Sequence, residues 1–140
     1  MPGHAEPSLC KFSAITATKR QTVIALQNMR FLQLKLEIMN SNLNTLNHQI
    51  TFGYNSNDAG SVNYFNDLIA KYNDVVGERN KLSKQYNQLK DLFNALVNKI
   101  SPSRNTTFVT CLNSELSVVE ATTTNQNGEL LNTNIETLRH

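Results

Sequence analysis

Apolar residues, with one threonine among them, recur at intervals of three and four positions between Thr22 and Ile50. This spacing places them at positions a and d of a heptad, where they form one line along a helix. The line consists of Thr22, Ala25, Met29, Leu32, Leu36, Met39, Leu43, Leu46 and Ile50. The pattern predicts a helix over residues 22–51 that packs lengthwise against another helix.

The same segment carries a second apolar line, formed by Ile24, Phe31 and Ile38, which are also seven residues apart. These residues occupy position c, which points away from the a/d line. A helix that is apolar on two sides is usually buried on two sides, so this helix needs cover from its own chain or from other copies. We therefore predict an oligomer or partner interface made of Ile24, Phe31, Ile38, Met29, Leu32 and Leu36.

Turn-forming glycine, asparagine and aspartate residues fill residues 53–61, which predicts a loop at the tip of the molecule. A second helix is expected over residues 62–100, and Pro102 ends it. Its apolar residues lie on one side only, because the remaining positions are polar. They are Phe65, Tyr72, Tyr86, Phe93 and Ile100 at position a, Leu68, Val75, Leu82, Leu89 and Leu96 at d, and Ile69, Val76 and Val97 at e.

Two long heptad helices joined by a short loop are expected to form an antiparallel hairpin. With the loop centre near residue 57, Arg79 faces the region of Leu36 and Glu37. Arg79 is the only charged residue at an a position of its helix, and Glu37 is the only acid in the first helix, so an ion pair between them would fix the register. The competing interpretation, in which the Arg79 stem packs while its guanidinium reaches water, is favoured.

Asparagine recurs at every seventh position of the second helix, at heptad position b. This position borders the e residues that widen the apolar face, so the heptad itself accounts for the column without a ligand. We expect the column to line the edge of a groove where a third helix or a second hairpin docks. Its members are Asn66, Asn73, Asn80, Asn87 and Asn94.

Residues 102–140 differ in character from the hairpin. The segments "TTFVTCL" and "LSVVEATTT" are rich in β-branched residues, and Asn127-Gly128 offers a tight turn, which predicts two or three short strands. The expected fold is mainly α: an antiparallel coiled-coil hairpin at residues 22–101, an irregular N-terminal arm at 1–21 and a β-stranded tail at 102–140. We expect this unit to lie within a homo-oligomeric bundle.

Composition limits the classes of partner. The 13 basic and 11 acidic residues are scattered and give a formal charge of only +2, so the dense basic stripe that nucleic acid requires is missing. No run of about 18 apolar residues predicts a membrane span, and no signal peptide is recognised in the chain as given. The compartment is left unknown, with the cytoplasm favoured.

The sequence offers little catalytic chemistry. It has no glycine-rich phosphate loop, no metal-spaced histidine pair and no nucleophile-elbow motif, so we expect no catalytic residue, no metal and no cofactor. The hairpin geometry brings Cys10 near Cys111. In an oxidising compartment these cysteines would form a disulfide, but in the cytosol they would be two buried small side chains, which is the favoured interpretation.

The sequence therefore predicts a non-enzymatic structural or interaction protein. In this hypothesis the coiled-coil hairpin self-assembles and presents its tip or its terminal strands to a protein partner. The alternative is a subunit of a fibrous viral or cell-surface appendage, with a trimeric coiled coil and a β-stranded tail. The low charge, the abundant asparagine and threonine and the order of helices before strands would suit this fibrous class.

Overall fold

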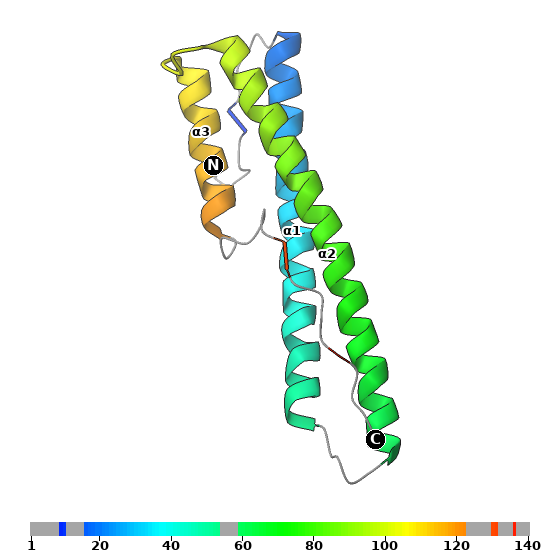
Figure 1. Ribbon diagram of the computed structural model, residues 1–140. Coiled ribbons are helices and arrows are strands. Elements are labelled where there is room, and N and C mark those ends of the chain that lie inside the picture. The colour runs from blue at the N-terminus through cyan, green and yellow to red at the C-terminus, as the bar shows by residue number, and fades with distance from the viewer. Residues whose placement is uncertain (1–8, 11–15, 54–58, 123–129, 132–135, 137–140) are drawn as a thin grey trace.

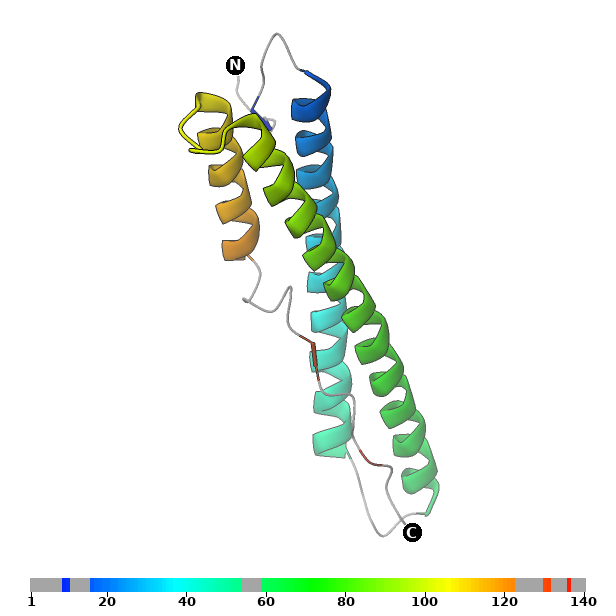
Figure 2. The same ribbon diagram turned by 45° about the horizontal axis from the view of Figure 1, so that its top comes forward.

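The computed structural model describes residues 9–10, 16–53, 59–122, 130–131 and 136. These residues contain two long antiparallel helices and one short helix (Figure 1). Helix α1 spans Ala17–Gly53, α2 spans Ala59–Ile100 and α3 spans Thr107–Thr122. The turned view shows α1 and α2 side by side along their length, with α3 beside their upper end (Figure 2). The predicted pairing of two long helices in a mainly helical chain is confirmed.

Local signals explain where these helices begin and end. Helix α1 starts at Ala17, ahead of the expected residue 22, because Thr16 caps it: the hydroxyl oxygen of Thr16 accepts a hydrogen bond of 3.3 Å from the backbone N–H of Lys19. Helix α2 ends at Ile100, as expected from Pro102. The tip between the two helices, residues 54–58, lies outside the described residues.

The contact between α1 and α2 follows the heptad line of α1. Met29 and Leu36 have no solvent exposure, and Leu43 is buried as well. On α2 the buried positions are a and e, while most of the d leucines are only half-buried. The buried residues of this face are Val62, Phe65, Ile69, Val76, Arg79, Ser83, Tyr86, Phe93 and Val97.

Helix α3 replaces the predicted strands. The described residues 107–122 of the two segments that were expected to be strands form this one helix, and none of the described residues is in a strand, so that prediction was wrong. The apolar residues Phe108, Leu112, Leu116 and Val119 recur at helical spacing and are buried, and this burial outweighs the weak preference of β-branched residues for strands. The predicted turn at Asn127-Gly128 lies outside the described residues.

The main core lies at the upper end, where the three helices meet. Residues from α1, α2 and α3 form one buried cluster there, and Cys10 from the preceding segment joins it. Leu26 occupies an e position of α1 and is fully buried in this cluster. The apolar surface that α1 carries beyond its a/d line is therefore covered in part by the chain itself.

Gly77 and Gly53 give opposite predictions for the same substitution. A Cβ added at Gly77, inside α2, meets no atom within 4 Å, whereas at Gly53 it would lie 2.7 Å from the ring of Phe65. We expect Gly77→Ala to raise the free energy of unfolding by about 0.5–1 kcal/mol, since alanine is the better helix former. Gly53→Ala should not raise the free energy of unfolding, because its Cβ would be too close to the Phe65 ring. Urea unfolding of both variants checks this, and a loss of stability in Gly77→Ala would contradict it.

Candidate functional site

A shallow apolar groove runs between α1 and α2. Two adjoining hollows of about 430 and 290 Å³ form it, and they share Asn28, Leu89 and Leu92. Leu89 and Leu96 at position d of α2, with Leu92 at position g, supply one wall, and position c of α1 supplies Ile24 and Phe31 to the other. We call this surface the groove; its lining is Gln21, Ile24, Ala25, Asn28, Phe31, Leu32, Gln85, Gln88, Leu89, Leu92 and Leu96.

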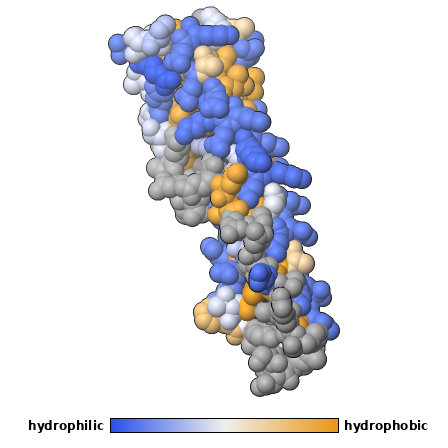
Figure 3. Space-filling model, in the orientation of Figure 1, coloured by the Kyte–Doolittle hydropathy of each residue, from blue (hydrophilic) through white to orange (hydrophobic). Residues whose placement is uncertain are grey.

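The six predicted interface residues divide into two sets. Met29, Leu32 and Leu36 are buried inside the chain and belong to the core cluster. The c-position residues remain exposed, with fractions of 47% for Ile24, 57% for Phe31 and 62% for Ile38. In the space-filling view, an orange apolar patch lies over the upper part of α1 at the right edge of the molecule (Figure 3). The c-position set is therefore the exposed part of the predicted interface, and of the buried set Leu32 lines the groove.

Aromatic side chains gather at the lower end of the hairpin. The rings of His48 and Phe52 lie 4.7 Å apart, and Tyr64 meets Phe65 edge-on at 5.0 Å. Phe52 and Tyr64 are 75% and 57% exposed. A hollow of about 300 Å³ lies between these residues, so the end of the hairpin presents exposed aromatic surface.

A buried charge lies halfway along the hairpin. The Arg79 side chain has no solvent exposure, and its Nε donates a hydrogen bond of 3.1 Å to Oδ1 of Asn40. Glu37, the expected partner, is exposed and lies about one turn before Asn40 on α1. The guanidinium thus neither reaches water nor bonds Glu37; its Nε donates to the amide oxygen of Asn40.

Asn80 connects this charge to the segment that follows α3. Its Oδ1 accepts a bond of 3.4 Å from Nη1 of Arg79 and one of 2.9 Å from the backbone N–H of Leu131. Its Nδ2 donates a bond of 2.9 Å to the carbonyl oxygen of Leu131. The asparagine column was expected to face a helix, but at Asn80 it binds main chain. The sequence marked this column by its period, whereas nothing singled out Asn40 or Leu131.

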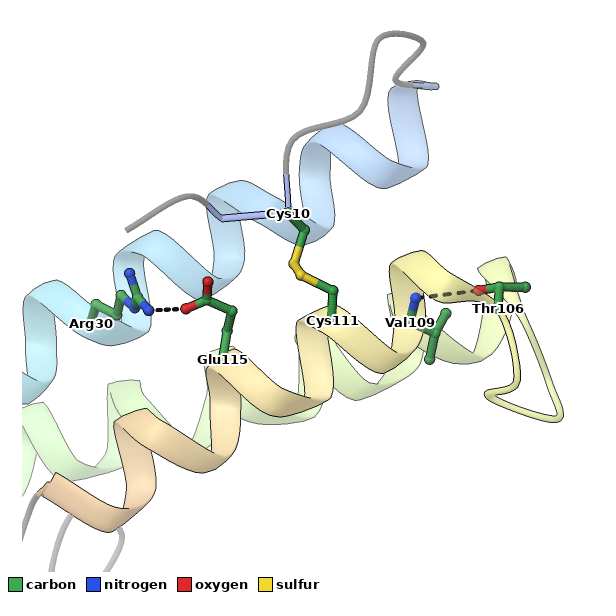
Figure 4. The surroundings of a disulfide bond; sticks show 6 residues. All are labelled: Cys10, Arg30, Thr106, Val109, Cys111 and Glu115. Atoms are coloured by element: carbon green, nitrogen blue, oxygen red, sulfur yellow. Dashed lines mark hydrogen bonds and ion pairs between the residues drawn. A yellow bond between two sulfur atoms is a disulfide. The ribbon is translucent and has the colours of Figure 1, made fainter. Parts of the chain in front are cut away.

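A disulfide joins Cys10 to Cys111 of α3, with 5.9 Å between the Cα atoms (Figure 4). An ion pair between Arg30 of α1 and Glu115 lies on the same side of α3, one turn further along (Figure 4). The hydroxyl oxygen of Thr106 caps α3 by accepting a bond of 3.2 Å from the N–H of Val109. The disulfide fixes α3 to the segment before α1, and the ion pair fixes it to α1 itself.

Chemistry beyond packing is sparse in the described part of the chain. No group of three or more histidine, cysteine, aspartate or glutamate side chains there is placed to hold a metal ion. None of the described helices is long and apolar enough to cross a bilayer. The described residues offer three candidate sites: the groove, the aromatic end and the polar contact at Asn80.

Loss of the disulfide should cost much of the stability. The bond closes a loop of 101 residues, for which chain entropy gives about 4–5 kcal/mol. We expect the melting temperature of the protein to fall clearly in dithiothreitol. The Cys10→Ser/Cys111→Ser variant should have the same melting temperature as the reduced protein, and dithiothreitol should not change that temperature. An unchanged melting temperature on reduction would contradict this.

The partner of Arg79 can be tested by a double-mutant cycle. Asn40→Ala removes the acceptor that the Nε–H of the buried Arg79 uses and should lower the free energy of unfolding by about 1–3 kcal/mol. Arg79→Met removes the charge and should make the further change Asn40→Ala nearly neutral. Urea unfolding of the four proteins gives the coupling, and simple additivity would show that the two side chains do not depend on each other.

Comparison with known proteins identifies no relative. No family model matches this chain, and no curated protein and no solved structure matches it at a significant level. The basis for a function is therefore the physical chemistry of the chain's own surfaces.

Proposed function

We propose that this protein is a non-enzymatic structural or interaction protein, a helical hairpin that self-assembles through its groove. The observation that carries the proposal is the exposed apolar line of Ile24, Phe31 and Ile38 beside the groove. Three large apolar side chains on one helix face, next to the 49% exposed Leu92 of α2, are costly to leave in water. Association removes that cost.

The chemistry of the groove favours a second copy of the same chain as the occupant. Among the described residues, its lining contains apolar residues and the neutral amides Gln21, Asn28, Gln85 and Gln88, but no charged side chain. In a two-fold symmetric interface the same patch of both copies is used, so this lining would face a second copy of itself, and residues near the axis would meet their own copies. A charged lining would repel its own copy, whereas amides can hydrogen-bond to each other across the axis.

Packing of helices supplies the mode of association. The c-position side chains of α1 are seven residues apart, so they advance by about 10.5 Å along the helix and can enter the groove of a second hairpin at regular intervals. The product would be a bundle in which the coiled-coil pattern of the sequence extends between copies. Lys35, whose Nζ lies 4.7 Å from the centre of the Phe31 ring, would remain at the rim.

The aromatic end of the hairpin is the proposed contact for a different protein. Phe52 and Tyr64 are exposed there, and aromatic side chains are enriched at the centres of protein interfaces. Assembly through the groove would leave this end accessible, because the groove is lined by residues nearer the other end of the hairpin. Self-association and partner binding would then use separate surfaces.

The disulfide supports an oxidising compartment in place of the cytoplasm. It also favours the second candidate function, a subunit of a fibrous viral or cell-surface appendage, since disulfides persist on virion and cell surfaces. The strands expected for that class are replaced by α3, so the candidate now depends on the helical part alone. Trimers that resist heat and detergent would favour this second function.

Two leucine substitutions test the self-association. Leu92 lines both hollows of the groove, while Leu34 of α1 has similar exposure and lies outside the lining. We expect the wild type to form dimers or larger species at micromolar concentration in light scattering. Leu92→Ser should dissociate them, since it removes roughly 1.5–3 kcal/mol of apolar burial from each copy, while Leu34→Ser should not. A monomeric wild type, or equal behaviour of both variants, would contradict the proposal.

A further inference from the structure

Asn80 contacts Leu131 through both main-chain groups of that residue. The amide of Asn80 accepts from the N–H of Leu131 and donates to its carbonyl oxygen, each at 2.9 Å. Hydrogen-bonded residues in an antiparallel sheet exchange the same pair of bonds. A side-chain amide on a helix here takes the place of a neighbouring strand. The short described stretch at Leu130 and Leu131 lies beside the middle of the hairpin in both views (Figures 1 and 2).

Arg79 holds this amide in one orientation. Nη1 of Arg79 donates to the same Oδ1 that accepts from Leu131, and a guanidinium has no acceptor with which to bind the Nδ2 group. Asn40 in turn holds Nε of Arg79. The donor and the acceptor of Asn80 are thus fixed before any segment binds, and such preorganisation lowers the entropic cost of binding.

The two hydrogen bonds of Asn80 to Leu131 do not involve the side chain of Leu131. They involve only the N–H and C=O of Leu131, and the neighbouring Leu130 is 55% exposed. Any residue other than proline carries the same two groups. The contact therefore selects an extended main chain, as edge strands do in β-augmentation, and it leaves the choice of side chains open.

We propose that Asn80, held by Arg79, is a binding site for extended polypeptide. The chain's own segment at Leu131 is the resident ligand. A peptide with the same main-chain geometry competes with this segment for the site. The proposal is independent of assembly through the groove, because Asn80 is not part of the groove lining.

Amide hydrogen exchange tests the resident contact. The N–H of Leu131 should exchange slowly in the wild type, and Asn80→Ala should raise its exchange rate by roughly 10- to 100-fold, the effect of losing two hydrogen bonds. Asn94→Ala, in the same column two heptads along, should leave that rate unchanged. An unprotected Leu131 N–H in the wild type, or equal rates in the two variants, overturns the proposal.

Peptide binding tests the site itself. Leu131→Pro removes the resident N–H, so this variant should bind a fluorescein-labelled peptide with the sequence of residues 125–137, detected by anisotropy. The wild type should bind at least tenfold more weakly, because its own segment competes. Leu131→Pro/Asn80→Ala should not bind, and Asn80→Asp, which keeps a partner for Arg79 but loses the Nδ2 donor, provides a second test if the alanine variant unfolds. Failure of the Leu131→Pro variant to bind, or equal binding after either change at Asn80, shows only an internal structural contact and overturns the proposal.

Discussion

The rotation of α2 about its own axis determines which side chains the hairpin offers to other molecules. Its buried face is centred between positions a and e. At about 100° per residue, positions b and d then lie on opposite borders of that face, each about 80° from its centre. Leu89 and Leu96 at d line the groove, together with Leu92 at g, and Asn80 at b contacts Leu131 on the opposite border. The rotation of α2 against α1 therefore places both the apolar groove and the polar contact at Asn80.

Two further constraints hold this arrangement in place. Arg79 lies on the buried face of α2, and its Nε donates a hydrogen bond to Oδ1 of Asn40 on α1. Sliding of one helix along the other would break this bond to a buried charge, which is costly. At the upper end, the Cys10–Cys111 disulfide and the contacts of α3 close the chain on itself. The aromatic end lies away from both constraints, which suits a region that adapts to a partner.

The sequence was sufficient for the two long helices, because their apolar period is long and regular and their breakers are clear. It failed for α3, where β-branched residues masked the helical spacing of Phe108, Leu112 and Leu116. It identified Arg79 as exceptional but assigned it to Glu37 or to water, since a register error of one turn cannot be seen without the packed helices. The contact between Asn80 and Leu131 could not be predicted from the sequence, because bonds to main-chain groups require no particular side chain in the bound segment.

The central claim is that the groove binds a second copy of the chain. The most direct measurement is an isotope-filtered nuclear Overhauser experiment on a mixture of labelled and unlabelled protein, which detects only contacts between copies. The account predicts intermolecular signals from the Phe31 ring to methyl groups of Leu92 and Ile38. Signals restricted to Phe52 and Tyr64 at the aromatic end, or none at concentrations where the protein is associated, would contradict it.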